Sequence, residues 1–250
     1  MMRKWLSRCL AGAVLSAALA LPVGAANTLT TGETVDPWAQ ALAEQAVAEK
    51  LMPQCLEGQD LRQNITRAQF AALAVKLYEA MSGDKVLAPA KNPFVDTEDA
   101  EVLKAYRLGI VSGMTEDTFC PDELVTREQA AVMLTGAFQA RQEREKKAYL
   151  LWVISQGQDN SLNGDTDLTQ QQSINLLAGI YHRLDGTLDT KGAQPFLDDG
   201  DISQWARESV YFMEKSGIIA GMGDGRFAPR DNAQCQAALC MAVKMLDKLG

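Results

Sequence analysis

The stretch GIVSGMTEDTFCPDELVTREQAAVML, residues 109–134, returns without a gap as GIIAGMGDGRFAPRDNAQCQAALCMA, residues 217–242. Both copies read as the end of a helix, a glycine-rich turn, a Phe-x-Pro loop and the start of another helix. A helix–loop–helix unit that recurs within one chain indicates a repeat architecture. The positions shared by the two copies include Gly109/Gly217, Ile110/Ile218, Gly113/Gly221, Met114/Met222, Phe119/Phe227 and Pro121/Pro229.

Apolar residues predict helices along most of the chain. They recur at i, i+3, i+4 and i+7, the spacing of a helix with one buried face. No alternating apolar and polar run is long enough to indicate a strand, so the predicted fold class is all-α. The predicted helices cover residues 38–51, 64–81, 100–108, 125–147, 148–156, 169–184 and 203–215, with a terminal helix that ends near residue 249.

Residues 1–25 predict an export signal. Three basic residues precede an apolar run at 10–21, and small residues at 23–26 suit cleavage after Ala25 or Ala26. The run is too short for a membrane span, and no later segment is long enough. We therefore expect a secreted chain at the cell wall or cell surface, with a linker at residues 26–37.

The charge of the chain limits its partners. The net charge is −8 for 250 residues, and removal of three basic signal residues makes it −11. An acidic surface argues against nucleic acid and anionic lipid. The cysteines after the signal have no CxxC spacing and are too few for a disulfide scaffold, although one bridge stays open. They are Cys55, Cys120, Cys235 and Cys240.

Several short motifs recur in the same order as the glycine-rich turn. Phe-x-Asp stands at 94–96 and 196–198, Trp-Ala at 38–39 and 205–206, and Ile/Val-Thr-Arg at 65–67 and 125–127. In this order they resemble S-layer homology modules, the cell-wall anchoring repeats of many Gram-positive bacteria. The units that carry the resemblance cover residues 38–82, 93–141 and 195–250.

The resemblance implies a pseudo-three-fold helical spindle with grooves between neighbouring units. In that family the grooves bind a secondary cell-wall polysaccharide linked to peptidoglycan, commonly with a pyruvate ketal. The motif arginine meets the anionic sugar, and groove glycines and the tryptophan line the site. The implied ligand-binding residues are Arg67, Arg127, Thr66, Thr126, Trp38, Trp205, Gly109, Gly113, Gly217 and Gly221.

The two arginines also attract attention on physical grounds. Thr-x-x-Gln is a capping box, which places Arg67 and Arg127 in the first turn of a helix. Free N–H groups and a forked guanidinium at that end suit a carboxylate ligand. A cation there slightly destabilises the helix. The alternative role is an ion pair with Asp or Glu between units.

The third unit and the segment before it depart from the pattern. Gln234 and Cys235 stand where the second unit has threonine and arginine, so at most two grooves keep a basic residue. Residues 142–191 read as a helical-hairpin insertion or as a decayed fourth repeat. Their Thr169-Gln170 also lacks the arginine.

Other candidate sites are weaker. The aspartate-rich loop at 159–167 does not match the spacing of a calcium loop. His182 is the single histidine and has no neighbouring ligand at metal-binding spacing. No catalytic set stands out, so we predict no metal, no cofactor and no enzymatic activity.

The sequence therefore predicts an exported, non-catalytic protein that binds an anionic, pyruvylated cell-wall polysaccharide. The alternative is an extracytoplasmic scaffold for protein–protein interaction or surface-layer assembly, with decayed wall-binding sites and other surface-layer proteins as partners.

Overall fold

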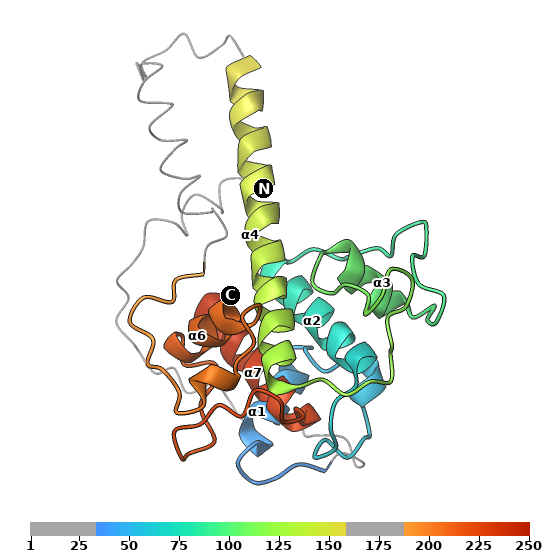
Figure 1. Ribbon diagram of the computed structural model, residues 1–250. Coiled ribbons are helices and arrows are strands. Elements are labelled where there is room, and N and C mark those ends of the chain that lie inside the picture. Colours follow the sequence, from blue (N-terminus) through green and yellow to red (C-terminus); the bar gives the residue numbers. More distant parts are fainter. Residues whose placement is uncertain (1–33, 159–187) are drawn as a thin grey trace, which may run out of the picture.

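A computed structural model describes residues 34–158 and 188–250 (Figure 1). The export signal, the aspartate-rich loop, His182 and the predicted helix at 169–184 lie outside the described residues. Within them the chain forms helices and irregular loops, with isolated bridges and no strand, which confirms the all-α class. No described helix combines the length and the hydropathy needed to cross a membrane.

The helices follow the predicted order, and α1 and α6 are shorter than the helices predicted at 38–51 and 203–215. The predicted helix at 38–51 ends early because Lys50 has a φ of 60° and breaks the helical turn. The one predicted from residue 203 begins later, after a turn. The helices are α1 (Gln40–Ala48), α2 (Arg67–Ser82), α3 (Ala100–Arg107), α4 (Arg127–Gln158), α6 (Arg207–Lys215) and α7 (Cys235–Leu249), with 3₁₀ turns η2 (Gln54–Leu56) and η3 (Asp199–Asp201).

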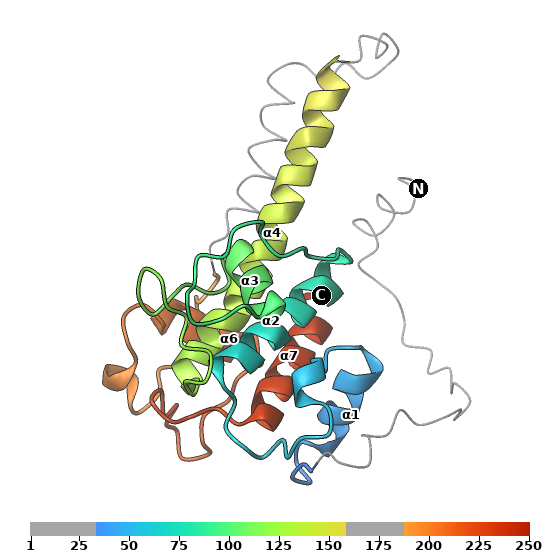
Figure 2. The same ribbon diagram turned by 90° about the vertical axis from the view of Figure 1, so that its right-hand side faces the viewer.

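Three long helices form the centre, and each carries a short helix from another unit. Helices α2, α4 and α7 contact one another, while α3 packs on α2, α6 on α4 and α1 on α7 (Figures 1 and 2). Each short helix therefore packs on the long helix of the preceding unit, and the first unit closes the cycle on the third. This exchange buries a continuous core through all three units.

A closed ring of backbone hydrogen bonds joins the units at the centre. The N–H of Val125 donates to Ile65 O at 3.0 Å, that of Ala233 to Val125 O at 2.8 Å, and that of Ile65 to Ala233 O at 2.9 Å. All three residues are buried. Three units satisfy every donor and acceptor in this ring, so it has no place for a fourth repeat.

The helices that follow the ring start as the capping pattern predicts. The Thr66 side chain accepts from Gln69 N, and the Gln69 side chain accepts from Thr66 N. Thr126 and Gln129 exchange the same two bonds. Gln234, at the start of α7, makes no capping bond with its side chain.

Helix α4 continues without a break past residue 141, where the sequence suggested that the second unit ends and an insertion begins. The segments predicted as separate helices at 125–147 and 148–156 are one helix that ends at Gln158. Arg141 donates to the Leu249 carbonyl, and Arg144 pairs with Asp84 at 2.5 Å, which fixes the rod to the body.

The junction between the third and first units is closed by a buried amide. Gln236 is fully buried, and its Nε2 donates to Asp36 Oδ2 at 2.7 Å and to Gln234 Oε1 at 2.9 Å. Its Oε1 accepts from Asp36 N at 2.9 Å. These bonds tie the start of the first unit to α7.

We predict that Gln236→Leu lowers the free energy of unfolding by about 1–3 kcal/mol, because it removes the hydrogen bonds that the buried amide exchanges with the half-buried Asp36. Urea unfolding measures the loss. The matched control is Gln40→Leu on the exposed face of α1, which should change stability by less than about 0.5 kcal/mol. Equal effects of the two substitutions would contradict the role given to Gln236.

Candidate functional site

Arg67 reaches from the first unit into the loop of the second. Its Nε donates to Phe119 O at 3.0 Å and its Nη2 to Ser112 O at 3.1 Å. The guanidinium carbon lies 4.6 Å from the centre of the Phe119 ring. Arg67 is 8% exposed, so this end of α2 holds a nearly buried cation.

Arg127 repeats the arrangement between the second and third units. Its Nε donates to Phe227 O at 2.8 Å, and its Nη2 donates to Ala220 O at 3.1 Å. Its guanidinium carbon lies 5.1 Å from the centre of the Phe227 ring. Arg127 is more exposed than Arg67, and its bond to Ala220 lies at the surface.

The ion pair that the sequence left open as an alternative is not formed. Neither arginine pairs with a carboxylate of the described residues. Backbone carbonyls occupy two of the five N–H groups that a guanidinium carries. Three N–H groups of each guanidinium remain beyond these two bonds.

Charge around the two guanidinium groups is mixed. Burial lowers the pKa of Arg67, while nearby Cys120, Glu123 and Asp96 raise it. Burial likewise lowers the pKa of Arg127, against the opposing effect of Asp231 and Asp198. Each guanidinium is therefore a partly buried cation with acidic groups near it.

The aspartate of each Phe-x-Asp motif holds the loop that the arginine contacts. Asp96 accepts from Phe119 N at 2.8 Å and from Cys120 N at 2.7 Å. Asp198 accepts from Phe227 N and Ala228 N at 2.8 and 2.7 Å. Sequence reasoning missed this role, although the motif itself was visible twice.

Two of the candidate glycines are required beside the arginine contacts. A Cβ on Gly113 would lie 2.3 Å from Thr115 O, and one on Gly221 would lie 2.7 Å from Arg226 O. Each follows directly the residue whose carbonyl accepts from the arginine. Gly109 and Gly217 instead lie two residues beyond the ends of α3 and α6, with φ of 72° and 64°.

The candidate tryptophans lie at the surface and not in the core. Trp38 is 59% exposed and Trp205 is 58% exposed, each directly before a fully buried alanine. Trp205 follows a turn that α4 holds, because the buried Glu128 accepts from Ser203 N and Oγ at 2.9 Å. Trp38 Nε1 donates to Asp36 Oδ2 at 3.3 Å.

The third junction lacks the arginine arrangement. Cys235 starts α7 at the position of Arg67 and Arg127 and is 3% exposed. Burial raises the pKa of its thiol to about 11, so the group stays neutral at ordinary pH. All four described cysteines are free.

An open cavity lies over the start of α4. It measures about 670 Å³ and is lined by the loop from Cys120 to Leu124, by the capping residues Thr126 and Gln129, and by Asn232. No described group of three or more His, Cys, Asp or Glu side chains could hold a metal ion.

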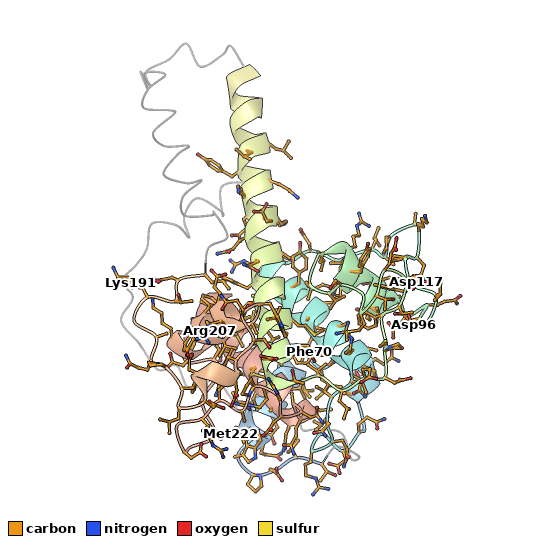
Figure 3. All side chains as sticks on the ribbon, in the orientation of Figure 1. Phe70, Asp96, Asp117, Lys191, Arg207 and Met222 are labelled. Carbon is orange, nitrogen blue, oxygen red and sulfur yellow. The ribbon has the colours of Figure 1, made fainter. Side chains whose placement is uncertain are left out.

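Large apolar side chains are exposed at equivalent positions of the second and third units. Val95 and Leu197, within the Phe-x-Asp motifs, are 77% and 81% exposed, and Met114 and Met222 are 55% and 54% exposed. Figure 3 labels Met222, which lies toward the edge of the body in that view, as do Asp96 and Asp117.

Comparison with known families gives two matches within the chain. Residues 96–131 and 195–233 match the S-layer homology domain. The first unit, 38–82, lies outside both matches. Its equivalence to the other two units is supported by the place of Ile65 in the hydrogen-bonded ring.

Curated proteins match over longer stretches. An amylopullulanase of Thermoanaerobacterium thermosulfurigenes is 26% identical over 199 residues, which is 72% of this chain and 10% of that protein. The exoglucanase XynX of Acetivibrio thermocellus is 26% identical over 56% of this chain and 14% of its own length. An endoglucanase of Bacillus sp. (strain KSM-635) is 27% identical over 48% of this chain and 15% of its own length. The chain thus spans only a small part of each relative.

We predict that the loop held by Asp96 loosens at acid pH. Its hydrogen bond from Phe119 N, with a further one from Cys120 N, lowers the pKa of Asp96 against the effect of burial. A lowered folded-state pKa stabilises the fold above the unfolded value of about 3.9, and this contribution is lost as pH falls through the folded value. Asp96→Asn should therefore lower the urea midpoint clearly at about pH 7 and much less at about pH 3.

The control for this experiment is Asp122→Asn, in the same loop, which should leave both midpoints near those of the wild type. If Asp96→Asn lowered the urea midpoint by the same amount at both pH values, the role of the charged carboxylate would be contradicted.

Proposed function

The chain contains S-layer homology domains, and from this premise we propose that it is a non-catalytic module that attaches to the cell wall. The proposed ligand is an anionic secondary cell-wall polysaccharide, with a pyruvate ketal as the charged group. Binding takes place at the junctions between units, with Arg67 and Arg127 as the charged anchors. Attachment is non-covalent, because it uses hydrogen bonds and ring contacts alone.

The observation that supports the proposal best is the repetition of one arginine geometry at two junctions. In each, Nε and one Nη donate to backbone carbonyls across the junction at 2.8–3.1 Å. These bonds and the phenylalanine ring below fix the plane of the guanidinium. A guanidinium fixed in this way loses little further entropy when its remaining N–H groups bind a carboxylate.

The two junctions should not contribute equally. Arg67 is nearly buried, whereas Arg127 is half-buried and its Nη2 bond lies at the surface. A ligand reaches Arg127 more easily, so we assign the stronger site to the junction of the second and third units. Trp205 belongs to this junction through Ser203 and Glu128 and offers an exposed ring for a sugar face.

The third junction favours a structural role over ligand binding. A neutral, buried thiol replaces the arginine there, and the Gln236 amide joins the two units. The missing arginine at this junction favours a second candidate function. In that function the chain is a surface-layer scaffold that binds protein partners, and its wall-binding sites have decayed. The names of the relatives describe enzymes, but the shared part is a small fraction of each, so no activity is carried over.

The test is co-sedimentation of the purified, secreted chain with native cell-wall sacculi and with sacculi stripped of the secondary polymer. We expect binding to native sacculi only. Arg127→Lys keeps the charge but removes the fork, and should weaken binding by about tenfold or more, since a charged hydrogen bond contributes about 1.5–3 kcal/mol. Arg67→Lys should weaken it less.

The matched control is Cys235→Ala, at the equivalent position of the third junction, which should bind as the wild type does. Circular dichroism of each variant establishes that it is folded. Equal binding to native and stripped sacculi would exclude the polysaccharide as ligand. Unchanged binding in folded Arg127→Lys and Arg67→Lys chains would leave the arginines with a structural role, and absence of wall binding together with capture of a surface-layer protein would favour the scaffold.

A further inference from the structure

The glycine-rich loops of the second and third units share one backbone arrangement but differ in a charged side chain. In the second unit the N–H of Met114 donates to Thr118 O at 2.8 Å, and in the third unit that of Met222 donates to Arg226 O at 2.8 Å. Thr118 and Arg226 each directly precede the phenylalanine whose carbonyl accepts from the arginine of the neighbouring unit. The two residues therefore occupy equivalent places, and only Arg226 is cationic.

The net charge of the two loops differs as well. Residues 115–123 read TEDTFCPDE, with four acidic residues and no basic one, so their net charge is −4. The equivalent residues 223–231 read GDGRFAPRD, with two acidic and two basic residues, so their net charge is 0. The basic residues are Arg226 and Arg230, which align with Thr118 and Asp122. An anionic ligand therefore meets less repulsion at the loop of the third unit.

Arg226 lies near the same carboxylates as Arg127. Its hydrogen-bonded ion pair with Asp224, at 2.7 Å, raises the pKa of Arg226, and Asp198 and Asp231 add to this effect. Burial lowers the pKa of Arg127, and the opposing effect comes from the same Asp231 and Asp198. Because the two guanidinium groups share two acidic neighbours, both belong to the junction between the second and third units.

The junction between the first and second units has the carboxylates but not the second arginine. Glu123 and Asp96 are acidic neighbours of Arg67. Thr118, at the position of Arg226, carries no charge, and its N–H donates to a threonine hydroxyl within its own loop at 3.1 Å. Arg67 therefore faces its two acidic neighbours without a second arginine at this loop position.

The side chain of Arg226 is accessible, whereas its backbone is held in place. The side chains of Arg226 and Asp224 are 59% and 48% exposed. An ion pair between two exposed side chains contributes little to stability, so Asp224 holds Arg226 only weakly. Gly221 approaches the Arg226 carbonyl so closely that a Cβ on the glycine would lie 2.7 Å from this oxygen. A cation on a fixed backbone, with a weak partner, suits contact with a ligand.

We propose that Arg226 is a second cationic contact at the junction between the second and third units. The inference rests on the proposed function and narrows its ligand. The ligand favoured at this junction is a stretch of anionic polysaccharide in which a second negative group lies close to the one that Arg127 binds. The junction between the first and second units, with Thr118 in the equivalent place, binds a single negative group. Arg226 is thus a specificity-determining residue.

The test is isothermal titration calorimetry of the full chain with isolated secondary polysaccharide fragments. Anion exchange separates these fragments into those with one and those with two charged groups. The wild type should bind the two-charge fragments about tenfold or more tightly than the one-charge fragments, since a second hydrogen bond between charged groups forms. Arg226→Thr installs the residue of the second unit and should abolish this preference, while the affinity for one-charge fragments changes by less than about twofold.

Two further variants make the test specific. Lys191→Thr removes an exposed positive charge of the third unit outside the loop, and it should leave the affinity for both kinds of fragment unchanged. Thr118→Arg is the reciprocal change, and it should raise the affinity of the junction between the first and second units for two-charge fragments by about tenfold. Circular dichroism establishes that each variant is folded.

Three outcomes would overturn the inference and leave the proposed function standing. Arg226→Thr could retain the preference for two-charge fragments. Arg226→Thr could weaken both kinds of fragment equally, which would give Arg226 a structural role in its loop. Arg226→Thr and Lys191→Thr could weaken binding to the same extent, which would show an effect of net charge alone. If neither kind of fragment bound to the folded wild-type chain, the proposed function itself would fail, and this inference with it.

Discussion

The three hydrogen bonds that link Ile65, Val125 and Ala233 are the constraint on which the structure depends. Each backbone group donates to one neighbour and accepts from the other, so no unit can shift without leaving a buried donor or acceptor unpaired. The ring sets the starting points of α2, α4 and α7 and fixes which loop each helix start faces. It thereby places Arg67 and Arg127 under the loops of the following units, and it makes the same position in the third unit a meeting point of the first and last parts of the chain.

Much of the fold could be predicted because it rests on local signals. The apolar stripes and the Thr-x-x-Gln capping boxes fixed the helices, and the repeated Phe-x-Pro loop revealed the units. Two features were beyond sequence reasoning. The ring consists of backbone bonds between residues at least 60 positions apart, and backbone groups leave no trace in side-chain pattern. The sequence also did not show that the helices predicted at 125–147 and 148–156 are one continuous helix, because a charged run such as 141–147 continues a helix as readily as it ends one.

The candidate site, too, was predictable where it depends on side-chain identity and not where it depends on backbone groups. The sequence identified both arginines and the missing third one, since all three are visible as differences at one aligned position. It could not reveal that their partners are the carbonyls of Ser112, Phe119, Ala220 and Phe227, because a carbonyl is present at every residue. The ion pair considered as an alternative has the correct chemistry for arginine but the wrong acceptor. Asp96 and Asp198, which are near enough to influence the two guanidinium groups, are instead used to hold the loops.

We propose that two of the three junctions bind polysaccharide and that the third is closed. The most direct measurement is the stoichiometry of binding, by isothermal titration calorimetry of the full chain with isolated secondary polysaccharide fragments that carry one charged group. We expect two sites per chain, with the site that contains Arg127 the tighter one, and that site weakened by about tenfold or more in Arg127→Lys. Three sites would contradict the closed junction at Cys235 and Gln236, and no binding to a folded chain would contradict the claim itself.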